Sequence, residues 1–245
     1  MSWTENLFKL KDHGTTVRTE VIAGVTTFLT MAYIIFVNPA ILGDAGMPKD
    51  AVFVATCLIA ALGTAVMALY ASYPIALAPG MGLNAYFAYT VVLGMGFQWQ
   101  AALGAVFISG CLFMAVTIFG LRGLIIRGIP QSLRNAITVG IGLFLALIAL
   151  KSAGIVAASK ATYITLGDLH SPPVVLASLG FLLIVALDKF RVPGAILIGI
   201  IAVTIASFFF GGNQFHGIFD MPPSIEPTFL TLDIKSAVSH GFLNV

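Results

Sequence analysis

The amino-acid sequence predicts an all-α membrane protein, on the evidence of its composition, its long apolar runs and one run that proline and glycine interrupt. Of the 245 residues, 59% are hydrophobic and 9% are charged, and the mean hydropathy is +1.02. Soluble domains carry about a quarter charged residues, and so apolar a chain has too little polar surface to cover a water-facing core. The composition therefore excludes a soluble domain and a disordered chain.

Charge and cysteine content narrow the class further. The net charge of +2 is too small to favour nucleic acid as a partner. Cys57 and Cys111 both lie within apolar runs, where cysteine is usually a small apolar side chain. A secreted disulfide scaffold is therefore excluded, and a multi-span protein in a lipid bilayer remains.

Seven apolar runs are long enough to be transmembrane segments. A helix needs about 20 mainly apolar residues to cross a hydrocarbon core of about 30 Å. The runs are Thr19–Leu42, Ala51–Tyr73, Pro74–Leu93, Trp99–Gly120, Asn135–Val156, Pro172–Leu187 and Pro193–Gly211. The first is too long for the apolar part of a cleaved signal peptide, so we expect it to remain as a helix.

Residues 1–18 precede the first run and are expected to lie at the cytoplasmic interface. Their apolar residues recur at helical spacing among charged ones, which indicates a short helix on the membrane surface; a disordered N-terminus is the alternative. These apolar residues are Trp3, Leu7 and Leu10.

The distribution of basic residues predicts a cytoplasmic N-terminus, because cytoplasmic loops are enriched in lysine and arginine. In this orientation the inner segments hold Lys9, Lys11, Arg18, Arg122, Arg127, Arg134, Lys189 and Arg191. The outer segments hold Lys49, Lys151, Lys160 and Lys235.

The third run is apolar enough to span the membrane but cannot be one straight helix. Pro79 removes a backbone donor and clashes with the preceding turn, and Gly80 and Gly82 add conformational freedom. A helix from Gly82 to Leu93 is about 18 Å long, roughly half the membrane. The residues before it must be extended or irregular, which is tolerated at membrane depth only where backbone is buried in protein or lines a cavity. This segment is therefore the predicted site.

Transporters use broken helices of this kind to direct half-helix N-termini at substrate. The predicted binding groups are the N–H groups of Gly82, Leu83 and Asn84, the Asn84 carboxamide, and an aromatic face from Tyr86 or Phe87. The first run adds polar side chains, which are expected mainly to bond their own helix or pack against neighbours. One or two of them could line the same cavity, with Thr30 as the candidate. The alternative is a simple kink at Pro79, with Asn84 hydrogen-bonded to a neighbouring span.

The rest of the chain is expected to serve this site as scaffold. Residues 121–134 alternate apolar residues with three arginines, which indicates an interfacial linker between the fourth and fifth spans. Residues 135–211 hold spans five to seven, and residues 212–245 form an external loop. The loop ends in Gly241–Val245, which looks like the start of a further span, so the chain is expected to be a fragment.

Acidic and catalytic groups are scarce. All ten acidic residues lie in loops or near span ends, whereas proton relays need a titratable group within the bundle. The four histidines have no metal-ligand spacing, and no protease, hydrolase or nucleotide-binding motif is present. We therefore expect no enzyme activity, no cofactor and no metal.

The third run also carries a family resemblance. The strings that carry it are Ala78–Thr90, Glu20–Gly24, Thr30–Ile34, Val37–Pro39, Gly140–Phe144, Leu150–Val156 and Val192–Ile200. The first of these resembles the third-helix signature of the AzgA-like purine permeases, a branch of the xanthine/uracil permease superfamily. The others, from the first, fifth and seventh runs, are similar to the same family.

The resemblance implies a 14-span fold of two inverted seven-span repeats, of which this chain looks like the first. Residues 19–120 would then hold the core-domain spans and residues 135–211 the gate-domain spans. The family's third-helix asparagine maps onto Asn84, which implies a purine contact there. The acidic residues for nucleobase and proton would lie in the second repeat.

The predicted function is secondary active transport of guanine, hypoxanthine or adenine, with a proton as coupling ion and a homodimer as one candidate assembly. The plasma membrane is the natural location for such uptake. The alternatives are a transporter of the same fold for another nucleobase or a small anion, and an inactive or partner membrane fragment.

Overall fold

The computed structural model describes residues 14–73, 75–159, 162–210 and 221–238. The predicted surface helix at Trp3, Leu7 and Leu10, part of the external loop, and the terminal apolar run from Gly241 lie outside these residues. The chain divides into two compact units, which are described separately. Unit 1 comprises residues 1–37, 55–79 and 149–222, and unit 2 comprises residues 38–54, 80–148 and 223–245.

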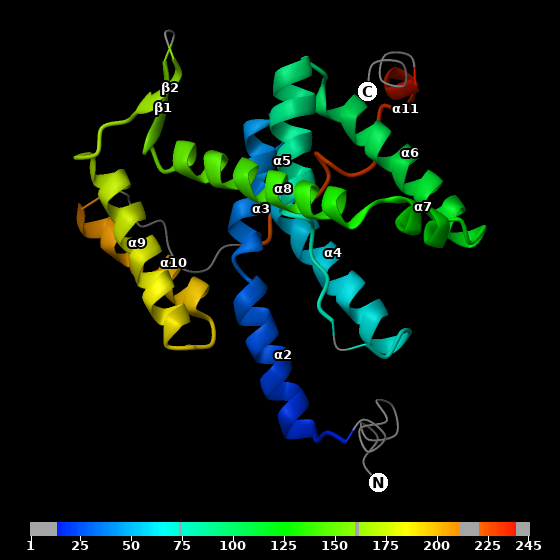
Figure 1. Ribbon diagram of the computed structural model, residues 1–245, viewed down its shortest axis with the longest axis horizontal. Coiled ribbons are helices and arrows are strands. Elements are labelled where there is room, and N and C mark those ends of the chain that lie inside the picture. Colours follow the sequence, from blue (N-terminus) through cyan, green and yellow to red (C-terminus); the bar gives the residue numbers. More distant parts are fainter. Residues whose placement is uncertain (1–13, 74, 160–161, 211–220, 239–245) are drawn as a thin grey trace. The chain divides into compact units, whose positions relative to one another are not determined.

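Helices make up most of the structure (Figure 1). The elements in chain order are α2 (Val17–Met31), α3 (Ile34–Asp44), α4 (Lys49–Leu69), α5 (Met81–Ala85), the π-helix η1 (Tyr86–Gly94), α6 (Trp99–Ile118), α7 (Arg122–Gly128), α8 (Gln131–Ser152), β1 (Val156–Ser159), β2 (Tyr163–Leu166), α9 (Pro172–Lys189), α10 (Ala195–Phe210) and α11 (Ile234–Ser236).

Among the described residues, five helical segments are long and apolar enough to cross a membrane: 17–44, 49–69, 99–118, 131–152 and 172–189. Their apolar side chains are largely exposed, and none of the most apolar stretch of α8 is buried. So much exposed apolar surface indicates contact with lipid. Helix α10 is also apolar but has 16 residues, and the third run is broken, so a seven-span count stays a prediction.

The first span is interrupted, although a single helix over Thr19–Leu42 was expected. Helix α2 ends at Met31 and α3 begins at Ile34. Thr16 caps α2 by accepting a hydrogen bond from the Thr19 N–H at 3.3 Å. No proline or glycine marks the break, which explains why the sequence did not predict it.

The mostly helical structure fits the predicted all-α class, and it contains in addition a short hairpin. Strands β1 and β2 pair antiparallel, with Val156 opposite Leu166 and Ser159 opposite Tyr163. The fifth span was expected to reach Val156, but α8 ends at Ser152 because the chain turns at Gly154, whose φ is +79°. The α8 helix also begins earlier than the predicted Asn135, directly after Pro130.

Close packing in unit 1 depends on glycine. Helices α9 and α10 lie side by side, and α10 also packs on α2. A Cβ atom added at Gly180 of α9 would overlap Val203 of α10, and one added at Gly199 of α10 would overlap Ile184 of α9. The two helices therefore approach through reciprocal glycine contacts, as small residues allow in membrane helices.

Candidate functional site

The third run contains an irregular segment followed by a helix. Residues 75–80 have no regular secondary structure, and α5 begins at Met81 and continues into η1 as far as Gly94. Gly80, the residue before α5, is extended with φ −78° and ψ 107°. Pro79 disfavours helix immediately before it, so the local chemistry of Pro79 and Gly80 accounts for where the helix begins.

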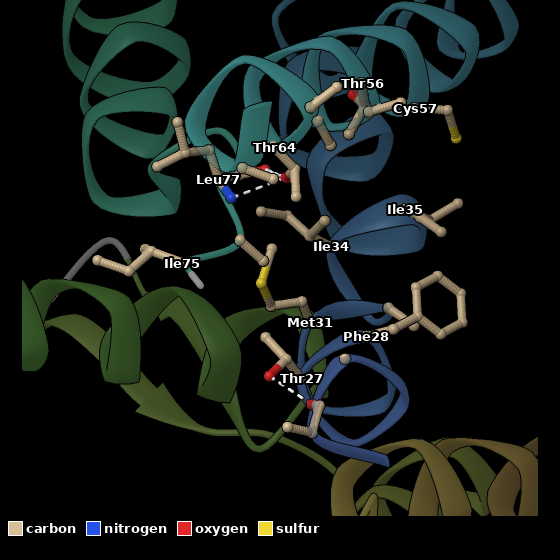
Figure 2. A pocket seen from close by; sticks show the side chains of 18 of the residues that line it. Thr27, Phe28, Met31, Ile34, Ile35, Thr56, Cys57, Thr64, Ile75 and Leu77 are labelled. Carbon is tan, nitrogen blue, oxygen red and sulfur yellow. Dashed lines mark hydrogen bonds between the residues drawn. The ribbon is translucent and has the colours of Figure 1, made fainter. Parts of the chain in front are cut away.

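The irregular segment is held by α4 within unit 1. The Leu77 N–H donates to Thr64 Oγ1 at 3.0 Å, and the Thr64 hydroxyl lies 3.3 Å from the Leu77 carbonyl oxygen (Figure 2). A Cβ at Gly63 would lie 3.5 Å from Leu77 Cβ, so α4 and the segment are in van der Waals contact. One threonine hydroxyl therefore forms hydrogen bonds with both backbone groups of Leu77. Lipid could form neither of them.

Asn84 contacts the first span within unit 2. Its Nδ2 donates a hydrogen bond to Oδ1 of Asn38 at 2.5 Å. Asn38, on α3, is 3% exposed, and Asn84 is half-buried. The structure thus contains the hydrogen bond to a neighbouring span that is the alternative prediction for Asn84. It leaves the Asn84 carboxamide partly open, so the bond does not exclude a binding role.

The predicted trio of free N–H groups is wrong in one member. Helix α5 begins at Met81, and the Asn84 N–H donates to the Gly80 carbonyl at 3.1 Å. The first turn of a helix leaves its leading N–H groups without intrahelical partners, and Asn84 already lies beyond them. The side chain of Asn84, rather than its backbone, is therefore its candidate binding group.

The other predicted site residues differ in accessibility. Leu83 is 73% exposed and Tyr86 is 46% exposed, whereas Phe87 is 8% exposed. Tyr86 is therefore the aromatic face that a ligand could reach. Gly82 lies beneath α8: a Cβ at this position would be 2.7 Å from Ile141 Cγ2. The lack of a side chain at Gly82 therefore allows close packing against α8.

Thr30 lies on α2 in unit 1, and its hydroxyl donates to the Thr27 carbonyl of the same helix at 2.8 Å. Its lining of one cavity with Asn84, which belongs to unit 2, stays a prediction. The Thr26 and Thr27 hydroxyls likewise bond their own helix, at 2.8 and 2.9 Å. Threonine commonly returns its hydroxyl to a preceding helical carbonyl.

A second polar contact joins α3 to η1, the helix that continues from α5. The Tyr89 hydroxyl of η1 donates to Asp44 Oδ2 at 2.7 Å. Asp44, the last residue of α3, is one of the acidic residues that the sequence places in loops or near span ends. Because Asp44 and Tyr89 are 45 residues apart in sequence, no local sequence pattern could predict their contact.

Unit 1 contains a cavity of about 680 Å³, within the range of small-molecule pockets. It is lined by α2, the start of α3, α4 and the irregular segment, and its lining is mostly apolar (Figure 2). Three threonines and one carboxylic acid contribute to the lining: Thr27, Thr56, Thr64 and Glu20. Glu20, in the first turn of α2, shows that an acidic residue near a span end can still reach a cavity.

Comparison with known proteins assigns a common origin to nearly the whole chain. The model of a permease family, that of the xanthine/uracil permeases, matches residues 18–243. One relative is a permease of Methanocaldococcus jannaschii, whose name states no substrate. It is 54% identical to this chain over all of this chain and 56% of its own length. The adenine permease AdeP of Escherichia coli is 47% identical over 98% of this chain and 54% of its own length.

The guanine/hypoxanthine permease PbuO of Bacillus subtilis is 48% identical over 88% of this chain and 51% of its own length. The chain thus spans about half the length of the curated relatives it matches. The resemblance seen in the sequence is confirmed at the level of the family.

Proposed function

From the premise that this chain belongs to the xanthine/uracil permease family, we propose that it takes part in transport of purine nucleobases across a membrane. The family is one of transporters rather than enzymes, and the chain is a multi-pass membrane protein. The named relatives act on adenine or on guanine and hypoxanthine, which supports a purine as substrate.

The observation that carries the proposal is the half-buried Asn84 carboxamide at the start of a helix that follows an irregular segment. A purine is a flat ring with N–H donors and nitrogen or carbonyl acceptors around its edge. A carboxamide supplies both complementary groups, and the exposed Tyr86 supplies an aromatic face. Asn84 and Tyr86 are the proposed purine contacts.

Substrate class is tested by uptake of labelled hypoxanthine and adenine into cells that lack their own purine permeases. The cells express the gene product that contains this chain. We expect uptake that unlabelled purines compete with and that uracil and small anions leave unchanged. Competition by uracil or by an anion instead would replace the purine with that substrate, and no uptake at all would favour an inactive or partner membrane protein.

The site is tested by Asn84→Ala, which should lower hypoxanthine uptake at least about tenfold, the effect of losing one buried hydrogen bond of average to high strength. Asn135→Ala is the matched control, because Asn135 also makes a side-chain hydrogen bond on a helix of unit 2, to Gln131 at 3.4 Å, but is exposed. Equal uptake by Asn84→Ala and Asn135→Ala would contradict the assignment of Asn84.

Coupling and topology are proposed on the family resemblance. We propose proton symport, seven spans over residues 19–211 that form the first of two inverted repeats, a homodimer, and a plasma-membrane location with the N-terminus cytoplasmic. Collapse of uptake by a protonophore tests the coupling. Accessibility of single cysteines, introduced at Lys49 and Arg127 after Cys57 and Cys111 are replaced, tests the orientation.

A further inference from the structure

We propose that Asn38 is a positioning residue that fixes the Asn84 carboxamide with its carbonyl oxygen toward the ligand, so that the site selects for a purine N–H donor. The inference deepens the proposed function and depends on Asn84 being a purine contact. It concerns which end of the Asn84 side chain meets the ligand.

The geometry of the two amides determines this orientation. Asn84 Nδ2 donates to Asn38 Oδ1 at 2.5 Å. A carboxamide is planar, with its nitrogen and oxygen on opposite branches, so fixing Nδ2 on Asn38 turns Oδ1 away from Asn38. Within the described residues, Asn84 Oδ1 accepts no hydrogen bond. The group left for a ligand is therefore principally an acceptor.

Asn38 is well placed to hold its neighbour because it is itself fixed. It is 3% exposed in the interior of α3 and precedes Pro39. Burial of a polar side chain is favourable only when its hydrogen bonds are made, so rotation of the Asn38 amide away from Asn84 is costly. Asn84, which is only half-buried, is the partner that would otherwise rotate.

A second contact joins α3 to the α5–η1 segment. Asp44 lies six residues after Asn38 on α3, and Tyr89 lies five residues after Asn84. The Tyr89 hydroxyl donates to Asp44 at 2.7 Å, so α3 and the α5–η1 segment run alongside one another in the same direction. Removing the Tyr89 hydroxyl disturbs the same pair of elements without changing the Asn84 amide, and Tyr89→Phe is therefore the matched control.

The consequence is a specificity that depends on an N–H group of the purine. An acceptor at Asn84 binds a ring N–H but not the same nitrogen once it is methylated. Sites built to hydrogen-bond one group reject analogues that lack it, because a buried polar group is then unpaired. If the amide could turn over, its N–H would meet the ligand instead, and this discrimination would fall.

The test compares hypoxanthine with its 1-, 3-, 7- and 9-methyl derivatives as competitors of labelled hypoxanthine uptake by the full gene product. The readout is the ratio of inhibition constants, which does not depend on how much folded protein reaches the membrane. Wild type is expected to discriminate against at least one derivative by about tenfold or more. Asn38→Leu, which removes the acceptor, is expected to reduce that ratio at least about fivefold, with KM raised and the maximal rate per molecule within about twofold.

Two further variants separate positioning from structural support. Asn38→Asp keeps an acceptor of the same shape and is expected to retain most of the discrimination even if less protein accumulates. Tyr89→Phe is expected to keep the wild-type ratio. An unchanged ratio in Asn38→Leu, or an equal loss in Tyr89→Phe, would overturn the inference. Wild-type uptake without purine competition, or an unaffected Asn84→Ala, would instead count against the proposed function itself.

Discussion

Tyr89 and Asp44 are joined by a hydrogen bond of 2.7 Å between elements that are 45 residues apart in sequence. The bond links the end of α3 to η1, whereas the contact between Asn38 and Asn84 links α3 to α5, the helix that η1 continues. A hydrogen bond to a charged carboxylate is stronger than one between neutral groups. It therefore contributes to holding the helix that bears the proposed site.

We expect Tyr89→Phe to lower the free energy of unfolding of the detergent-purified protein by about 1 kcal/mol. The thermal midpoint should fall accordingly. The ring remains, so only the hydroxyl contact is removed. Tyr70→Phe serves as the control, because Tyr70 is 90% exposed at the end of α4. Identical midpoints for the two variants would show that the Asp44 contact contributes nothing measurable.

How far the sequence predicts this structure depends on how local each signal is. Pro79 and Gly80 act on their own backbone, so the break in the third run could be predicted to within one residue of Met81. The choice of Asn38 as partner of Asn84 depends on how two distant segments pack, and residue types alone left it open. The interruption of the first span at 32–33 carries no proline or glycine and had no local signal at all.

The hairpin illustrates the same limit. Val156, Ile164 and Thr165 are β-branched and favour strands. A strand of only four residues that follows an apolar helix has too few residues for its periodicity to differ from that of a longer helix. Gly154 was the available signal, since a glycine at positive φ commonly ends a helix. The end of the fifth span was therefore predicted four residues too late.

Thr64 is predicted to be required for the irregular segment. Its hydroxyl is the partner of both the N–H and the carbonyl of Leu77. Thr64→Val keeps the side-chain shape but leaves these groups unpaired, which costs about 1–3 kcal/mol and should lower the thermal midpoint. Thr64→Ser keeps the hydroxyl and should stay close to wild type. If valine and serine were equally tolerated, the two hydrogen bonds would not matter to stability.

Asp233 is predicted to make the short helix α11 sensitive to acid. Its carboxylate accepts hydrogen bonds from the Ser236 hydroxyl at 2.5 Å and the Ser236 N–H at 2.9 Å. These bonds hold the pKa of Asp233 below its ordinary value of 3.8, with the hydroxyl bond as the largest cause. A lowered pKa means that the stabilisation is complete above the ordinary value and is lost as the pH falls through the lowered one.

NMR of the Ser236 and Ala237 amides should therefore show α11 intact at neutral pH and lost only below about pH 4. Asp233→Asn keeps an acceptor at the cap but cannot titrate, so its amide signals should not change over the same range. Loss of α11 near neutral pH, or the same acid transition in Asp233→Asn, would assign the titration to another group.

Gly82 offers a test of whether its missing side chain serves packing or ligand. A Cβ there would lie 2.7 Å from Ile141 Cγ2, a methyl group on the branched Cβ that cannot easily move aside. We expect Gly82→Ala to destabilise the protein by about 1–3 kcal/mol, the usual cost of overpacking. The double variant Gly82→Ala/Ile141→Ala should recover part of the lost thermal midpoint, because the second change makes room for the new methyl group.

Gly140→Ala is the control for the change of glycine itself, since no atom lies within 4 Å of a Cβ at that position. Alanine is the better helix former by about 1 kcal/mol, so this variant should be as stable as wild type or slightly more stable. If the double variant regains both stability and hypoxanthine uptake, the role of Gly82 is to let α8 pack on α5. If stability returns but uptake does not, the backbone at Gly82 approaches the ligand as well, which is the role that the sequence predicted for it.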